Sequence, residues 1–262
     1  MDIASYAIEA AVQETHWWFV GRRRLFEKEL QRLGFNNSHA VLDVGTSTGT
    51  NLALLRDMGF RRVTGLDMSE EAIAFCVGKG LGPVKLGDAC AMPFKDESFD
   101  LVLATDVIEH LDDDRAGLRE ISRVLTPSGK VLVTVPAFPS LWGLQDRVSQ
   151  HRRRYRVASL LAAVSNSGLQ PIRHYHFNYL LFAPIWLARR AIDLFNPSVQ
   201  HEGEVNNPAI NWILSRVFDV DTALAPYLRM PFGVSILLIC ERKQPVQTMR
   251  VSSREDANRQ AL

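Results

Sequence analysis

The chain has 262 residues, of which 47% are hydrophobic and 23% charged, which is ordinary for a soluble globular protein with one large α/β domain or two small ones. With 30 Lys and Arg against 29 Asp and Glu, it lacks the basic excess of bulk nucleic-acid binding, so no nucleic acid is expected as a partner. The three cysteines are far apart and form no CxxC pair, which argues against a zinc site or a disulfide framework.

Glycine and proline are scarce in residues 1–38, and we expect this segment to be helical and to act as an N-terminal lid. It lacks the basic start and apolar core of a signal peptide, which together with the unpaired cysteines favours a cytoplasmic protein. The segment contains HWWF, His16 to Phe19. Two adjacent tryptophans cannot both face one core from a helix, so either one closes over a ligand site or both pack ordinarily on the sheet.

Apolar runs alternate with helical patterns over the next 200 residues or so. Strands are expected near residues 41–45, 62–67, 82–88, 99–107, 130–136, 169–177 and 232–242. Helices are expected over 52–58, 69–79 and 115–125, the last ending at the turn TPSG, residues 126–129. Strands alternating with helices predict right-handed βαβ units.

We therefore predict an α/β fold with one domain over residues 39–243. Its core is a Rossmann-like, seven-stranded, mostly parallel sheet with helices on both faces and an antiparallel last strand. A helical insertion, residues 177–231, separates strands six and seven. The polar segment 244–262 is expected to be a disordered tail.

A small-residue loop, DVGTSTG from Asp43 to Gly49, follows the first strand, where ligands of parallel sheets bind. The second strand ends in Asp67, whose carboxylate can accept hydrogen bonds from both hydroxyls of a ribose. A dinucleotide fingerprint starting at Gly45 fails at Ser47 and Thr50. The carboxylate of Asp43 would repel a pyrophosphate but favours the sulfonium and ammonium groups of S-adenosylmethionine.

Three motifs resemble those of the Rossmann-like (class I) methyltransferases that use S-adenosyl-L-methionine, and the run from Val41 to Pro136 resembles their type 11 family. They are VLDVGTSTG, LGDACAMPFKDESFDLVLATDVIEHLDD and EISRVLTPSGKVLVTVP. The sequence departs from the family pattern at Ser47, where GxGxG has its middle glycine, and at Ser128 in the turn. Both residues are small, so we expect cofactor binding to survive.

The resemblance implies a role for each matching position in binding the cofactor. The loop around the methionine part is formed by Asp43, Gly45, Thr46, Ser47 and Gly49. The ribose acid is Asp67, and Met68 packs on the adenine. The adenine amino group and ring edge are bound by Asp88 and Ala89, and the floor under the methionine part is formed by Thr105 and Asp106. No metal ligand is implied.

The acceptor side offers fewer indications. His110, in the EH pair after the fourth strand, is the candidate catalytic residue, because a neutral imidazole can take a proton from an acceptor hydroxyl; alternatively it is a structural wall. HRRRY, His151 to Tyr155, suits a phosphate or carboxylate, or is a solvated basic turn.

Residues 177–195 are unusually apolar and aromatic, with Leu187, Ala191 and Leu194 expected on one helix face. This segment is an acceptor lid, a dimer surface, an interfacial helix on a membrane, or plain core. Its combination with HWWF and HRRRY resembles a bacterial subgroup of the type 11 family that is associated with cell-surface glycan or lipid-linked sugar chemistry.

These patterns predict an enzyme that transfers a methyl group from S-adenosylmethionine to a small-molecule, glycan or lipid-linked acceptor, at oxygen. The alternatives are a non-catalytic protein that binds the same cofactor as a regulator or partner, and an NAD-dependent oxidoreductase, which Ser47 and Thr50 disfavour. The expected location is the cytoplasm, with peripheral contact to the inner face of the membrane through residues 177–195. The sequence leaves the acceptor, the methylated atom and the oligomeric state open.

Overall fold

The computed structural model describes residue 6 and residues 10–195 and 207–244, so the expected tail lies outside the described residues except for its first position. The strands are β1 (Ala40–Val44), β2 (Arg62–Asp67), β3 (Val84–Leu86), β4 (Phe99–Thr105), β5 (Leu125–Pro136), β6 (Leu169–Phe177) and β7 (Ser235–Arg242). The helices are α2 (Trp17–Arg32), α3 (Thr50–Asp57), α4 (Glu70–Gly78), α5 (Asp114–Val124), the 3-10 helix η1 (Pro139–Leu141), α6 (Leu144–Val148), α7 (Val157–Val164), α8 (Phe182–Phe195) and α9 (Pro208–Leu228).

The strands form one seven-stranded sheet in the order β3-β2-β1-β4-β5-β7-β6. All pairs up to β5 are parallel, and β7 runs antiparallel to both β5 and β6. The predicted fold class is confirmed, including the antiparallel last strand and the helical insertion before it. The strand order reverses between β1 and β4, which is where open α/β sheets bind their ligands.

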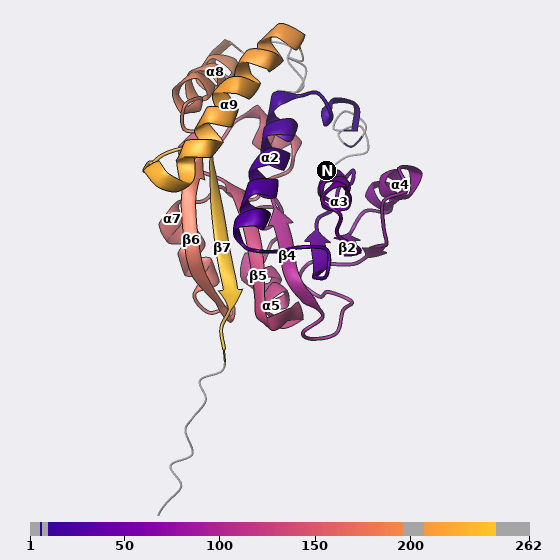
Figure 1. Cartoon of the computed structure of the whole chain (residues 1–262). Coiled ribbons are helices and arrows are strands. Elements are labelled where there is room, and N and C mark those ends of the chain that lie inside the picture. The colour runs from indigo at the N-terminus through magenta and orange to yellow at the C-terminus, as the bar shows by residue number, and fades with distance from the viewer. Residues whose placement is uncertain (1–5, 7–9, 196–206, 245–262) are drawn as a thin grey trace, which may run out of the picture.

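Each face of the sheet carries its own hydrophobic core. One core packs α5 and α7 on the sheet, through residues such as Leu118, Ile121 and Leu160. The other packs α2, α3 and α9 on the opposite face, around Phe26 and Phe218. Figure 1 shows α2 and α9 side by side on that face. Burial on both faces explains why β4 and β5 read as nearly continuous apolar runs.

The turn expected at residues 126–129 is wrong as a separate element, because β5 already begins at Leu125. Leu125 pairs with Phe99 and Lys130 with Leu101, so the β5 side has three more residues between these pairs than the β4 side. The Pro and Gly of TPSG thus accommodate an irregularity within the strand pair instead of ending it. In the described part of the expected N-terminal helical segment, residues 6 and 10–12 and α2 (Trp17–Arg32) are helical.

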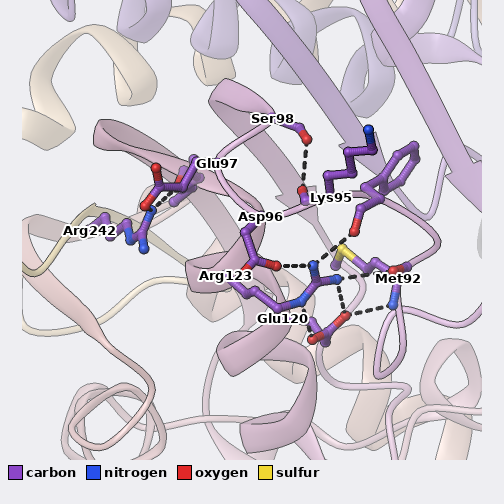
Figure 2. A network of polar contacts seen from close by, with 10 residues as sticks. Met92, Lys95, Asp96, Glu97, Ser98, Glu120, Arg123 and Arg242 are labelled. Carbon is purple, nitrogen blue, oxygen red and sulfur yellow. Dashed lines mark hydrogen bonds and ion pairs between the residues drawn. The ribbon is translucent and has the colours of Figure 1, made fainter.

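An arginine-centred network fixes the segment between β3 and β4 (Figure 2). The Arg123 guanidinium on α5 pairs with Glu120 and Asp96, each at 2.7 Å, and donates to the backbone oxygens of Phe94 and Met92. These bonds tie the segment that follows Asp88 to the helix beneath it. Four backbone and side-chain acceptors on one guanidinium make this a well-ordered connection.

The helical insertion is anchored to the sheet by one buried carboxylate. Asp221 of α9 accepts hydrogen bonds from the backbone N–H groups of Asn178, Tyr179 and Leu180, at 2.6 to 2.8 Å. These residues directly follow β6, so the contact holds α9 against the end of that strand. Helices α8 and α9 lie at the end of the molecule where β4 and β5 finish (Figure 1). Among the described residues, no helix combines the length and apolar character needed to cross a membrane.

Candidate functional site

The loop after β1 has the backbone of a tight ligand-binding turn. Gly45, Ser47 and Gly49 all have positive φ, at 68°, 50° and 87°. A Cβ on Gly45 would lie 2.5 Å from a methyl carbon of Val107, so this position has no room for any side chain. Ser47, where the sequence departs from the family pattern, accepts a backbone conformation that glycine adopts more readily.

Asp67, at the end of β2, is joined to this loop. One oxygen of its carboxylate accepts the backbone N–H of Ser47 at 2.8 Å, and the other accepts that of Ser69 at 3.0 Å. Each carboxylate oxygen retains a second lone pair for a further donor. The expected ribose acid is therefore held in a fixed orientation beside the glycine loop.

Asp43 is completely buried at the end of β1. Its Oδ1 accepts a hydrogen bond from the Asn51 amide at 2.8 Å, and the same amide donates to the Thr105 hydroxyl at 2.9 Å. Its Oδ2 is buried without a hydrogen-bond partner among the described residues. Burial raises the pKa of Asp43 to about 7, against the lowering effect of the Asn51 hydrogen bond. A buried carboxylate with one oxygen that accepts no hydrogen bond suits a cationic ligand.

The expected adenine side lies on the neighbouring strand. Leu86 pairs with Asp67 across the β2–β3 ladder, so Asp88 and Ala89 follow at the same edge of the sheet. The Asp88 carboxylate accepts the backbone N–H of Cys90 at 2.7 Å. Met68 is one of the most exposed apolar side chains described, at 78%. Its exposure at this edge leaves it available to pack on a planar group.

Arg22 of α2 is a site residue that the sequence reasoning did not identify. Its guanidinium pairs with the carboxylate of Asp106 at 2.9 Å, and Asp106 also accepts the Thr134 hydroxyl at 3.0 Å. The ring of Phe26 lies 5.3 Å from the same guanidinium. The N-terminal helix is thereby fastened to the residue that follows β4. A basic residue three positions after HWWF was the only signal for this contact.

A small cavity of about 60 Å³ separates α2 from the loop after β1. It is lined by Phe19, Arg22, Arg23, Phe26, Gly45, Thr46, Ser47, Thr50, Asn51 and Thr105. Gln13, ahead of α2, accepts the hydroxyls of Thr48 and Thr50 at 2.6 and 2.8 Å, which closes the N-terminal segment over the loop.

The two tryptophans of HWWF do not line this cavity. Trp17 packs edge-on against Phe218 with ring centroids 5.4 Å apart, and Trp18 stacks on Phe177 at 6.1 Å. Both tryptophans therefore pack on the same hydrophobic core, and the expectation that adjacent tryptophans cannot share one core is wrong, because Phe218 of α9 contacts both rings. The neighbouring Phe19 faces the cavity.

Glu109, His110 and His151 meet on the acceptor side, with one potential metal-binding atom of each within 4.8 Å of the others. The rings of the two histidines contact edge-to-face at 4.7 Å. Burial, helped by the charge of His151, lowers the pKa of His110 to about 4, so its imidazole is neutral at physiological pH. Burial also raises the pKa of Glu109 well above its ordinary value, and nearby Asp106 adds to this effect.

The basic side chains of HRRRY are paired with acids of the chain itself, which argues against an open anion site, whereas Arg152 and its partner Asp112 are exposed, as in a solvated turn. Asp146 of α6 accepts hydrogen bonds from His151 at 2.8 Å and from Arg154 at 2.7 Å. Arg152 pairs with Asp112 and Arg153 with Asp114, both at 3.2 Å. Local charge counting missed this, since the acids come from other segments.

Helices α8 and α9 carry many exposed apolar side chains. We call the following exposed side chains the α8–α9 surface: Trp186, Leu187, Leu194, Ile210, Trp212, Ile213, Val220, Leu224, Tyr227 and Leu228. The predicted face of Leu187, Ala191 and Leu194 is indeed exposed. Arg189, by contrast, is buried and donates to the backbone oxygen of Leu141 at 2.6 Å. It supports the loop after β5.

Comparisons with known proteins agree with this geometry. Residues 42–133 match the family described as "Methyltransferase domain" (Methyltransf_11). A Mycolicibacterium smegmatis protein named "Probable S-adenosylmethionine-dependent methyltransferase" is 32% identical over 160 residues, covering 60% of this chain and 61% of the relative. A demethylmenaquinone methyltransferase of Corynebacterium efficiens is 33% identical over 129 residues, covering 47% of this chain and 54% of the relative.

Among solved structures, the [4+2]-cyclase SpnF superposes with a TM-score of 0.58 at 20% identity, covering 85% of this chain and 81% of SpnF. This likeness concerns the fold alone. The chain spans less than two thirds of the length of either relative named above.

Proposed function

Residues 42–133 form a methyltransferase domain of the type 11 family, whose members use S-adenosylmethionine, and on this premise we propose that the chain transfers a methyl group from that cofactor to a small-molecule, glycan or lipid-linked acceptor, at oxygen. The observation that carries the proposal is Asp67, fixed by backbone donors beside a loop that has no room for a side chain at Gly45. This arrangement lies at the reversal of strand order, where a nucleoside is expected.

The residues present fit the cofactor. Asp67 would accept the ribose hydroxyls, and the open Oδ2 of Asp43 would face the cationic part of the methionine moiety. Asp88 and Ala89 would bind the adenine edge. When bound, the cofactor supplies a methyl group on a positively charged sulfur, which leaves as a neutral thioether. The chain lacks the glycines that a dinucleotide pyrophosphate requires, which disfavours the oxidoreductase alternative.

The protein's own contribution to transfer would be largely positioning. Thr105 and Asp106 would form the floor that holds the methyl donor, and Arg22 keeps α2 over it. In-line alignment of nucleophile, methyl carbon and sulfur accounts for much of the acceleration in such reactions. His110 is the candidate group to receive the proton of an acceptor hydroxyl, because its imidazole is uncharged at neutral pH.

The acceptor is expected near the α8–α9 surface, and we propose that this surface rests on an anionic membrane. Arg190 lies 5.9 Å from the Trp186 ring and Arg216 lies 5.9 Å from the Trp212 ring, an amphipathic pairing typical of membrane interfaces. The acids of the two helices are Asp193, Asp219, which pairs with Arg24 and lies 3.8 Å from Arg216, and the buried Asp221. A lipid-linked acceptor would then reach the site along the surface it occupies.

Labelled methyl transfer tests the proposal. The purified protein is incubated with methyl-labelled S-adenosylmethionine and separate aqueous and lipid extracts of cells. We expect label in a product of one extract with the wild-type protein and none with an Asp67→Asn variant. Cofactor binding without any labelled product from either extract would favour the non-catalytic alternative. This alternative is retained because a shared fold does not by itself imply a shared activity.

A further inference from the structure

We propose that Glu109, His110 and His151 bind one divalent transition-metal ion, which would hold and activate the acceptor oxygen. As an account of catalysis this rests on the proposed function; as a binding site it can be tested without the cofactor. The three potential ligand atoms lie within 4.8 Å of one another, so small shifts of these side chains would bring all three to the distance of about 2.0–2.2 Å that one ion requires.

Glu109 provides the observation that calls for a ligand. Its side chain is completely buried, and neither carboxylate oxygen has a hydrogen-bond partner among the described residues. A buried carboxylate without partners is costly whether it is charged or neutral. The guanidinium groups of Arg22 and Arg154 act on it only through space, while Asp106 opposes its ionisation. A cation beside the two histidines would satisfy these oxygens directly.

His151 is already oriented as a metal ligand. Its Nδ1 is 2.8 Å from Oδ1 of Asp146, which leaves Nε2 as the nitrogen for an ion. A carboxylate behind a histidine fixes the ring and makes its other nitrogen a better ligand. Asp146 is itself held by Arg154 at 2.7 Å and by the backbone N–H of Gly143 at 2.8 Å. The ligand is thus set in place by contacts that need no metal.

The two chain segments of the site are also joined through their backbones. The N–H of Arg152 donates to the carbonyl oxygen of Glu109 at 2.8 Å, so the segment after α6 is held against the end of β4. The ring of His110 contacts that of His151 edge-to-face at 4.7 Å. These contacts give a nearly preformed site, in which binding an ion requires little reordering of the chain.

The ligand set indicates the class of ion. Two imidazoles and one carboxylate suit zinc, manganese or iron(II), whereas magnesium and calcium prefer oxygen ligands. Three protein ligands leave a position for an oxygen of the acceptor, whose hydroxyl would lose its proton to solvent more readily when bound to the ion. In this arrangement His110 would be a ligand instead of the base named above, and solvent would accept the proton of the metal-bound hydroxyl.

Equilibrium dialysis against Zn²⁺ and Mn²⁺, with tag-free protein and no cofactor, tests the site. We expect the wild-type protein to bind one ion per chain with either metal. Glu109→Gln, which keeps size and hydrogen-bonding capacity, and His151→Gln should each weaken binding at least tenfold. His176→Gln is the matched control, because His176 is another buried histidine whose Nδ1 lies 3.0 Å from the backbone oxygen of Met230.

Two further readouts separate a lost ligand from a lost fold. The ion should raise the melting temperature of the wild-type protein and of His176→Gln but not of Glu109→Gln. Titration with S-adenosylhomocysteine should be unchanged in both site variants, so a failed metal site and a failed cofactor site are distinguishable. If a site variant does not fold, His110→Gln takes its place. Wild-type binding weaker than about 1 mM, or equal binding by the folded site variants, would overturn the proposal.

Discussion

The guanidinium of Arg22 lies 2.9 Å from the carboxylate of Asp106, and this ion pair connects the N-terminal helix with the residue that follows β4. Both side chains are largely buried, so the pair is less screened than one at the surface. Because Arg22 also lines the cavity against the glycine loop, α2 and the expected floor of the cofactor site form one unit.

Arg22→Gln should therefore weaken cofactor binding, if α2 acts as a lid. We expect about a tenfold lower affinity for S-adenosylhomocysteine. One charge-assisted contact contributes about 1.5–3 kcal/mol, and part of this free energy stabilises the fold instead of the bound cofactor. Calorimetric titration measures the change. Arg56→Gln, which removes an exposed arginine on α3, is the control. Equal affinities in the two variants would mean that α2 only packs against the sheet.

Cofactor affinity should depend on pH through Asp43. Its pKa is raised to about 7, so this carboxyl is protonated below that value and charged above it. A cationic ligand favours the charged form, so affinity for S-adenosylmethionine should rise up to tenfold per pH unit below pH 7 and level off above it. Titrations between pH 5.5 and 7.5 check this, below the range in which an α-amino group loses its charge, about 7.7–8.0.

Asp43→Asn should abolish this pH dependence. The same linkage affects stability in the opposite direction. A raised carboxyl pKa in the folded state means that stability falls as pH rises from about 4 to 7, and the variant should lose that slope. A wild-type affinity that is flat over this range would show that Asp43 does not face the cation.

Substitutions at two positions of the glycine loop should differ in their effect on stability and on cofactor affinity. Gly45→Ala places a Cβ 2.5 Å from Val107 at a positive φ, so we expect a stability loss of about 1–3 kcal/mol and loss of S-adenosylhomocysteine binding. Ser47→Gly removes a side chain from a positive-φ position and should keep affinity within about threefold of wild type. Thermal unfolding and calorimetry measure both effects.

The double variant Gly45→Ala/Val107→Ala distinguishes two effects of the added methyl group, its clash with Val107 and its obstruction of the bound cofactor. Removing the valine methyls should restore folding, while the added methyl group at position 45 still stands where the cofactor meets the backbone. Normal binding by the folded double variant would contradict the assignment of this loop.

Membrane binding should depend on the α8–α9 surface but not on Arg189. The wild-type protein should sediment with anionic lipid vesicles at low salt, because buried apolar area contributes about 25 cal/mol per Å² and each nearby cation about 1 kcal/mol. Ser in place of Trp186 and Leu187 should release it with little change in melting temperature. Arg190→Gln should weaken binding mainly at low salt.

Arg189→Gln is the matched comparison for the neighbouring arginine. It should lower stability through its lost bond to Leu141 and leave vesicle binding unchanged. If the wild-type protein does not sediment with the vesicles at any salt concentration, the membrane proposal is contradicted.

The sequence predicted those parts of the molecule that depend on local patterns. β6 begins at Leu169 and ends at Phe177 as expected, because its bounds are encoded by neighbouring residues. The tight backbone of the loop from Asp43 to Gly49, with positive φ at Gly45, Ser47 and Gly49, follows from its small residues for the same reason, while its role in cofactor binding stays a prediction. Contacts between distant segments could not be predicted, since no local pattern records them.

Asp146 illustrates this limit. His151 and Arg154 are only five and eight residues away from it, but no local pattern shows that α6 turns this carboxylate toward them, and Arg189, 43 residues further along the chain, comes near only after folding. HRRRY therefore looked like free positive charge. Arg22 is similar, because its partner Asp106 is 84 residues away and becomes a neighbour only after the sheet forms.

The central claim, that Asp67 and the glycine loop bind S-adenosylmethionine, is tested most directly by titrating an Asp67→Ala variant with S-adenosylhomocysteine. The control is Asp57→Ala, which removes an exposed carboxylate on α3. Losing two charge-assisted bonds, each worth about 1.5–3 kcal/mol, costs about 3–6 kcal/mol, so affinity should fall by more than about 100-fold in the first variant and stay at the wild-type value in the second. Affinity of Asp67→Ala within threefold of wild type, or wild-type binding of NAD in preference to S-adenosylhomocysteine, would contradict the account.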